Sequence, residues 1–447
     1  MGGAGSGTKT FAKIGNKIGL EIKLVNLQPD NFETKIMKSI SKILIFLSLC
    51  ISFQIVGAQN VEVPELGEGA YGSVMTCGPG EEFYESFGHS ALRICDTANG
   101  LDIVFNYGIF DFDEPNFYLK FAGGRLNYFV GAQRFEHFVS EYQYYGRSVT
   151  EQRLRMTKTE LQRLYELLAE NSKPENKYYK YDFFRDNCAT RVRDMIVASL
   201  EDDDKPLFNP DKGISSYRDM IYKYSGATSP WWCFGVDILL GARCDKRMTS
   251  DQYMYIPMEM MAQFDTLTTL AGNPVSEPSQ QLLPQIQKTT PPLLTPTLCF
   301  MLLFILVLIL TLVARHKAWR LQWLDAILFS LSALVSVLLL YLWFGSDHWC
   351  TKWNFNLLWA NPLFFWIVCR LHKPNRGVTI ALIICLVAML LIWLAGWPQT
   401  FNSATMLIAL TLLLRLHARK RRTENGERRT ENGERRTRKE YRNNVIT

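Results

Sequence analysis

The chain has 447 residues and a net charge of +6 that is concentrated at one end. Between positions 415 and 442 there are 12 Lys and Arg residues against 5 Glu residues, so the remainder of the chain is close to neutral. This distribution excludes nucleic-acid binding as the reason for the positive charge, and it is typical of a basic tail beside a membrane. Hydrophobic residues make up 48% of the chain, and apolar runs dominate from about residue 297 onward.

The first part of the chain is predicted to carry an export signal. Residues 1–36 show no sustained periodicity, and we interpret them as an upstream extension or a misplaced start. In 37–58, Lys38 and Lys42 precede an apolar run that ends in small residues, as in a secretory signal peptide. Export predicts that the following globular domain, 59–272, folds outside the cytosol, where disulfides are permitted.

The cysteines of this exported domain do not determine a disulfide pattern. Five are present, so at least one stays unpaired or pairs with another chain. Cys233 and Cys244 are the pair closest in sequence, but spacing alone does not establish connectivity. No Cys and His spacing resembles a zinc site, so no metal is expected.

Alternating residues predict a β-hairpin with a histidine at its start. His89 follows a glycine and begins an alternating strand through Ile94, and the residues at 96–100 favour a turn. The returning strand is expected at 103–107, which places Asn106 roughly opposite His89. A lone histidine in a strand is more often structural than catalytic, so His89 needs a partner to gain significance.

That partner is a cysteine at the predicted start of a helix. Asp186 and Asn187 are favoured N-cap residues, and apolar residues recur at helical spacing after them, at positions 189, 192, 196 and 200. Cys188 is therefore expected in the first turn, where the helix dipole and free N–H groups favour a thiolate. The alternative is a small buried residue that packs under the helix, and this stretch alone leaves both interpretations open.

Two further helices are predicted in the same domain. A capping box at 157–160 begins one that ends near Asn171, and another is expected through 217–221. The apolar segments at 231–234 and 254–261 are interpreted as core, or as packing on the membrane surface, in preference to an acyl-chain groove.

The C-terminal part is predicted to cross the membrane repeatedly. Six prolines between Pro274 and Pro296 indicate a linker, 273–296, before an all-α transmembrane domain, 297–416. Five apolar segments are expected to span the bilayer, at about 297–314, 324–344, 355–371, 378–397 and 404–416. Basic loops alternate with weakly charged turns, which places the N-terminal domain outside and the repeat tail, 417–447, in the cytoplasm.

A cysteine and a histidine are the necessary parts of a thiolate nucleophile and its base. Here the histidine precedes the cysteine, the reverse of the ordinary papain-like order. This order resembles the circularly permuted papain-like fold of NlpC/P60 relatives, and the expected fold class is α+β for the exported domain.

Several short blocks together resemble the Lnb-type lipoprotein N-acyltransferases. They are Thr-Cys-Gly-Pro-Gly at 76–80, Phe-Gly-His-Ser-Ala at 87–91, Phe-Asn-Tyr-Gly at 105–108, Arg-Ser-Val-Thr-Glu-Gln at 147–152, Asp-Asn-Cys-Ala-Thr-Arg at 186–191, and Asp-His at 347–348 with Asn-Pro at 361–362. The resemblance covers 62–416 and extends to the architecture of signal peptide, exported domain and membrane spans. Departures are confined to the first 36 residues and the repeat tail.

The resemblance implies acyl transfer at the periplasmic face of a bacterial inner membrane. Cys188 would attack an ester of a membrane phospholipid to form a thioester, with His89 as general base and then acid, and Asn106 orienting His89. The acceptor would be the α-amine of the S-diacylglyceryl cysteine of a diacylated apolipoprotein. No cofactor is needed. Supporting positions are Asn187, with Asp186 and Arg191 expected to build the turn, and His348 at the entrance of a span.

Three other functions stay open at this point. A Cys-His peptidase or amidase acting on cell-wall peptides would use the same two residues. A phospholipase or an intramolecular lipoprotein transacylase would differ only in the acceptor. A membrane receptor without enzymatic activity would have Cys188 and His89 as core residues.

Overall fold

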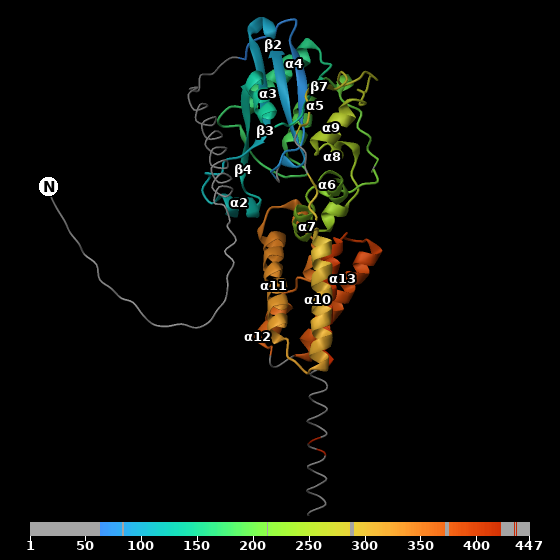
Figure 1. Ribbon diagram of the computed structural model, residues 1–447. Coiled ribbons are helices and arrows are strands. Elements are labelled where there is room, and N and C mark those ends of the chain that lie inside the picture. Colours follow the sequence, from blue (N-terminus) through green and yellow to red (C-terminus); the bar gives the residue numbers. More distant parts are fainter. Residues whose placement is uncertain are drawn as a thin grey trace, which may run out of the picture. The chain divides into compact units, whose positions relative to one another are not determined.

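The computed structural model describes residues 63–82, 85–211, 213–286, 290–371 and 375–421, together with 433 and 435 (Figure 1). The chain divides into two compact units, Met1–Glu62 and Val63–Thr447, and the described residues belong to the second. The predicted upstream extension, the signal peptide at 37–58 and most of the repeat tail lie outside the described residues.

Seven antiparallel strands form one sheet in the order β6-β4-β3-β2-β1-β5-β7. They are β1 (Tyr71–Cys77), β2 (His89–Asp96), β3 (Leu101–Ile109), β4 (Asn127–Arg134), β5 (Val149–Arg153), β6 (Tyr178–Lys180) and β7 (Gln280–Leu283). The predicted hairpin is confirmed as β2 and β3, with Ala91 opposite Asn106. The α+β class of this domain is likewise confirmed, whereas the permuted papain-like topology stays a prediction.

Both faces of the sheet are covered, because successive residues of β1 and β2 point to opposite sides. Val74 and Leu92 are paired in register and pack in the larger core with α4 and α5. Met75 and Ala91, the next pair, pack on the other side with α3. The covering helices are α3 (Phe135–Tyr144), α4 (Lys158–Asn171) and α5 (Cys188–Ser199).

The helices predicted within this domain are confirmed. The capping box of Thr157 and Glu160 begins α4, which ends at Asn171 as expected. A group of shorter helices completes the domain: α2 (Phe117–Gly123), α6 (Tyr217–Ser225), α7 (Pro230–Leu239), α8 (Ser250–Tyr253) and α9 (Pro257–Phe264). Met254 and Met260 lie in the core, as predicted, whereas Trp231 is exposed and packs near Phe300 of the first apolar helix.

Cys233 and Cys244, the closest pair in sequence, are not bonded to each other. All cysteines among the described residues are free thiols, and these two are buried in the core that α6 and α7 share.

The segment predicted as a linker, 273–296, contributes an edge strand. β7 pairs with β5 and lies between Pro278 and Pro284, in a short stretch that contains no proline. Proline is tolerated at strand ends and edges because it cannot donate to a central ladder. The sheet therefore extends beyond residue 272, where we expected the domain to end.

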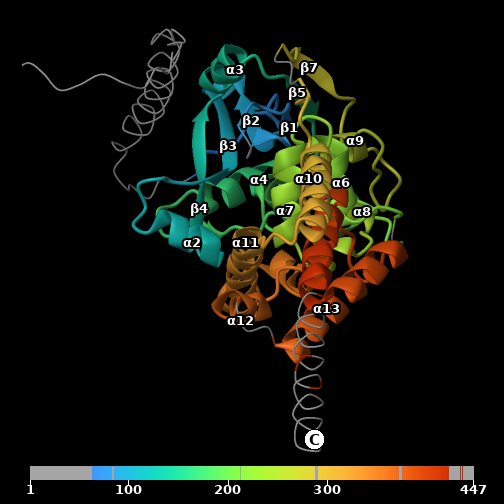
Figure 2. The ribbon, with the colours of Figure 1, turned by 60° about the horizontal axis from the view of Figure 1, so that its bottom comes forward.

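Three helical stretches of the C-terminal region are long and apolar enough to cross a membrane: Pro296–His316, Gln322–Gly345 and Arg376–Ala395. They contain α10 (Pro296–His316), α11 (Gln322–Leu340) and α13 (Arg376–Ala395), which Figure 1 and Figure 2 show together in one helical region. Residues 403–421 are also helical, over the segment predicted as the last span.

The third predicted span is interrupted among the described residues. Within 355–371 the chain forms a 3₁₀ turn, Phe355–Leu358, and then the short helix α12 (Leu363–Cys369). Pro362 and the polar Asn361 separate the two, and a seven-residue helix is too short to cross the bilayer alone. The count of five spans therefore stays a prediction.

Side-chain amides of the C-terminal region cap α7 of the N-terminal domain. The amide of Asn354 donates to the carbonyls of residues 238 and 239 (2.8 and 3.0 Å), and that of Asn356 donates to the carbonyl of 237 (3.0 Å). Gln399 donates to the carbonyl of residue 240 (3.2 Å). The last carbonyls of a helix have no partner within it, so these amides supply the missing donors.

We expect Arg218→Met to destabilise the fold by about 3–5 kcal/mol, because it would leave two buried carboxylates without their partner. Arg218 is 2% exposed and its guanidinium pairs with Asp237 (2.6 Å) and Asp245 (2.9 Å). Unfolding followed by far-UV circular dichroism in detergent would measure the change. Arg134→Met is the control, since the Arg134 side chain is 72% exposed; similar stability of the two variants would contradict the prediction.

Candidate active site

Cys188 is the first residue of α5, and Asn187 caps that helix. The Asn187 side-chain oxygen accepts from the Thr190 amide (3.0 Å), and the Thr190 hydroxyl accepts from the Asn187 amide (2.8 Å). The Asn187 side-chain nitrogen donates to the carbonyls of Phe183 (3.0 Å) and Tyr255 (2.7 Å). The predicted helix start is thus confirmed, and the cap fixes the position of Cys188.

Three backbone N–H groups act on the half-buried Cys188 thiol by lowering its pKa. Those of Cys188 and Ala189 come from the helix start, and that of Ser90 comes from β2. Gly108 of β3 also approaches closely: a Cβ on it would lie 3.5 Å from the Cys188 Cβ. Its φ of +89° favours glycine as well. Donors from helix and sheet therefore converge on one sulfur atom.

His89 begins β2, immediately before the Ser90 amide that faces Cys188. Gly88 permits this approach, because its φ is +80° and a Cβ there would lie 2.3 Å from the Cys77 carbonyl oxygen. The structure thus brings the predicted cysteine and histidine to the same end of β2. Among the hydrogen bonds of the described residues, none joins the His89 ring to the Cys188 thiol.

Asn106 selects the tautomer of His89. Its side-chain oxygen lies 3.2 Å from His89 Nε2, across the β2–β3 hairpin. An amide oxygen can only accept, so Nε2 carries the proton and Nδ1 keeps its lone pair. A neutral imidazole in this state has its free base at Nδ1, which is what proton removal from a thiol requires.

Burial determines the resting charge of both residues. Burial lowers the pKa of His89 to about 4, Arg147 acts in the same direction, and the bond to Asn106 opposes them. Burial also raises the pKa of the Cys188 thiol, while the N–H groups of Ser90, Ala189 and Cys188 itself, and the charge of Arg147, partly offset this. The resting pair is therefore a neutral thiol and a neutral imidazole.

This charge state corrects the prediction of a resting thiolate. The N–H groups at the helix start act on the Cys188 pKa in the expected direction. The pKa is nevertheless raised overall, because burial penalises the charged sulfur more strongly than the N–H groups favour it.

Arg147 is a site residue that the sequence analysis did not single out. Its buried guanidinium bonds to Glu85 (2.7 Å) and to the Gly78 carbonyl (3.0 Å), and its charge lowers the pKa values of both His89 and Cys188. The sequence feature that could have indicated Arg147 is its place in the block 147–152. Spacing along the chain alone could not show that it lies near His89 and Cys188.

Two family models match the chain in the predicted order. Residues 68–209 match the Lnb N-terminal periplasmic domain, and residues 287–423 match the Lnb transmembrane domain. The chain belongs to the Lnb family. It is accordingly an enzyme of lipoprotein maturation in the inner membrane, with its N-terminal domain in the periplasm. No curated protein and no solved structure matches the chain.

The supporting residues of this Lnb chain divide into two groups. Asp186 forms an ion pair with Arg191, whose guanidinium lies over the Tyr179 ring at 4.1 Å, so both residues stabilise the turn before α5. His348 lies elsewhere: its Nε2 is 2.9 Å from the carbonyl oxygen of Phe121, on α2. His348 therefore contacts α2, and this hydrogen bond does not involve Cys188.

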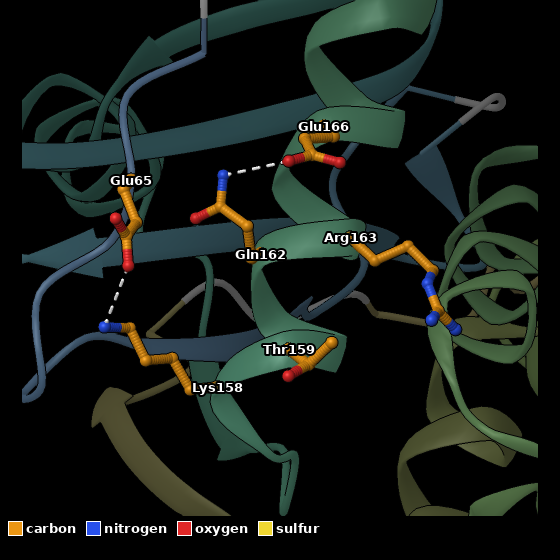
Figure 3. Close-up of a pocket in the computed structure, with 6 residues that line it drawn as sticks. All are labelled: Glu65, Lys158, Thr159, Gln162, Arg163 and Glu166. Carbon is orange, nitrogen blue, oxygen red and sulfur yellow. Dashed lines mark hydrogen bonds and ion pairs between the residues drawn. The ribbon is translucent and has the colours of Figure 1, made fainter.

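A surface hollow on the Lnb periplasmic domain lies apart from this site. Figure 3 shows it along α4, where Lys158 pairs with Glu65 (3.2 Å) and Gln162 donates to Glu166 (3.1 Å). Its lining contains neither Cys188 nor His89. The described residues contain no group of three or more His, Cys, Asp or Glu arranged to hold a metal ion.

The neutral pair predicts a particular pH profile for alkylation of Cys188 in this Lnb protein. Because the thiol pKa is raised, the rate with iodoacetamide should still be increasing above the ordinary thiol pKa of about 8.5. Peptide mass spectrometry after timed alkylation would measure it, with N-acetylcysteine as the reference thiol. A rate that is already constant between pH 5 and pH 8 would instead indicate a thiolate paired with a protonated His89.

Proposed function

We propose that this chain transfers an acyl chain from a membrane phospholipid to the α-amine of the S-diacylglyceryl cysteine of an apolipoprotein, through a thioester on Cys188. The observation that carries the proposal is the junction of α5 and β2, where Cys188 begins α5, the Ser90 N–H acts on its thiol, and His89 is the residue before Ser90. Membership of a lipoprotein-maturation family supports the class of substrate.

In the first half-reaction, His89 Nδ1 removes the proton from Cys188 as the sulfur attacks the ester carbonyl carbon. The resulting oxyanion is stabilised by backbone N–H groups near the sulfur, which are those of Ser90, Cys188 and Ala189. The C–O bond to glycerol then breaks, and His89 returns the proton to the leaving oxygen. The products are a lysophospholipid and an acyl thioester on Cys188.

In the second half-reaction, the free α-amine of the apolipoprotein attacks the thioester carbonyl carbon. His89 takes a proton from the attacking nitrogen, and the C–S bond breaks after the tetrahedral intermediate has formed. The sulfur recovers a proton from His89, which restores the neutral pair. The balanced outcome is one new amide bond for one ester bond, with no oxidant, reductant or cofactor.

Because His89 is a weak base, it needs the bound substrate to help it remove the proton from Cys188. With a His89 pKa of about 4 and a raised Cys188 pKa, proton transfer alone is unfavourable. Proton transfer to His89 becomes favourable only when the sulfur bonds to the ester carbonyl carbon at the same time. The N–H groups then stabilise the oxyanion that forms. The nucleophile would therefore be generated chiefly when an ester carbonyl is in place.

The direct test is the intact mass of a reporter lipoprotein from cells that depend on this chain for lipoprotein maturation. We expect an added acyl mass with the wild-type chain and with Cys369→Ala, an exposed thiol away from the site, and none with Cys188→Ala. Equal acylation with Cys188→Ala would overturn the thioester mechanism. Changed cell-wall peptides without any acylation would favour a peptidase. An unchanged intact mass, with fragment ions that place one acyl chain on the α-amine and only one on the glyceryl group, would favour an intramolecular transacylase.

Variants of Asn106 test its assigned role in positioning His89. Asn106→Ala removes the bond to Nε2 and should lower the transfer rate by about 10²-fold. Asn106→Asp places a negative charge beside His89, which raises the His89 pKa from about 4 and moves the acidic limb of the pH–rate profile to higher pH.

A fluorescent phospholipid donor and a diacylated lipopeptide acceptor in detergent micelles would give both rates and profiles. The control is Asn273→Asp, at an exposed position. If Asn106→Asp leaves the acidic limb in place, Asn106 does not govern the protonation of His89.

A further inference from the structure

α2 and the loop before it carry large apolar side chains that are exposed on the periplasmic domain. The exposed fractions are 79% for Tyr118, 70% for Leu119, 56% for Phe112 and 47% for Phe121. We name these four residues the α2 patch. Isolated exposed apolar residues are ordinary, but large ones gathered on one short helix indicate a surface that another apolar phase covers.

The α2 patch is joined to the end of a helix that is long enough to cross the membrane. The Asp347 amide donates to the Gly123 carbonyl at the end of α2 (2.8 Å), and Asp347 also pairs with Arg125 (3.0 Å). Asp347 lies two residues after the end of the stretch Gln322–Gly345. Figure 1 and Figure 2 both show α2 beside α11. These contacts place α2 beside the C-terminal end of this apolar helical stretch.

A row of aromatic rings leads from the patch toward the reacting sulfur. Phe117 of α2 lies 5.9 Å from Phe110, Phe110 lies 5.3 Å from Tyr128, and Tyr128 stacks on Tyr181 at 4.2 Å between ring centroids. Burial raises the pKa of Tyr181, and a negative charge on Cys188 adds to that shift, so this last ring lies in the electrostatic range of the sulfur. Phe110 is also two residues beyond Gly108, where an added Cβ would lie 3.5 Å from the Cys188 Cβ.

We propose that the α2 patch is buried in the periplasmic leaflet of the inner membrane and that the aromatic row leads an acyl chain of a leaflet phospholipid to Cys188. Aromatic side chains are favoured at membrane interfaces, and a seven-residue helix can lie on the surface but cannot span the bilayer. The second part of the proposal rests on the acyl transfer proposed above, whereas the first does not.

Charges beside the patch suit a phospholipid headgroup. Arg125 keeps 57% of its side chain exposed although it pairs with Asp347, and Lys120 of α2 is 36% exposed beside Glu114. Cations near aromatic and aliphatic side chains match a phosphate next to acyl chains. A soluble protein that covered the α2 patch would need an acidic surface to match these cations. A membrane needs no such partner, because α11 lies beside α2 and would itself be in the bilayer.

Photo-crosslinking tests membrane contact without using the reaction. The benzophenone amino acid p-benzoylphenylalanine would replace Leu119 in the full chain, reconstituted into vesicles of phosphatidylethanolamine and phosphatidylglycerol. Tyr144 of α3, which is 72% exposed, is the matched control position. We expect phospholipid-mass adducts at least tenfold more abundant at 119 than at 144. Equal yields, or adducts at neither position, would overturn burial of the patch.

Transfer rates test the path to Cys188. Leu119→Glu should reduce acylation of Cys188 by vesicle phospholipids about tenfold, because a carboxylate replaces an apolar side chain in the leaflet. It should leave acylation by a water-soluble short-chain thioester unchanged, and Tyr144→Glu should change neither. Equal loss with both donors, or no loss with phospholipid, would overturn the path. A wild-type chain that is acylated by neither donor would overturn the proposed function and the path with it, while crosslinking would still decide the membrane contact.

Discussion

Asn187 ties the first turn of α5 to two other parts of the domain. Its side-chain oxygen completes the cap with Thr190, and its nitrogen holds the carbonyls of Phe183 and Tyr255. Tyr255 lies far along the chain, so a local capping signal also serves as a long-range contact. The positions of the Cys188 sulfur and of the N–H groups at the start of α5 depend on this cap, since Cys188 is the next residue.

Burial raises the pKa of the Cys188 thiol more than the backbone N–H groups lower it, and this has a consequence for oxidation of the sulfur. A periplasmic thiol lies in an oxidising compartment, and oxidation proceeds through the thiolate. The raised pKa of Cys188 keeps the sulfur protonated at rest. Under the proposed mechanism, the same burial that slows activation of the thiol would protect it from oxidation between turnovers. The N–H groups would then stabilise the negative charge that develops once a substrate is bound.

Features that local sequence determines were predictable, and features that depend on tertiary contacts were not. The α5 cap and the placement of Asn106 across the hairpin from the start of β2, within reach of the His89 side chain, follow from residue type and strand period, so the core of the site could be named from sequence. Arg147 reaches the site only because β5 lies beside β1, a non-local pairing. Burial set the charge state of Cys188, and burial has no signature in a short motif. Hydropathy likewise predicted one continuous span at 355–371, where the structure has a 3₁₀ turn and a short helix. A hydropathy average contains no information about asparagine side chains that bond to another helix.

The cap on α7 limits where the chain can be cut into fragments that keep their structure. Asn354, Asn356 and Gln399 provide the donors for the last turn of a helix that belongs to the other half of the chain. Residues 63–447 form one compact unit, in agreement with this exchange. A periplasmic fragment cut at residue 272 would expose those carbonyls to solvent and lose the anchor of α7. The periplasmic half is thus better regarded as one part of a membrane protein than as a soluble domain on a tether, and exchanging halves between relatives would require exchanging these amides as well.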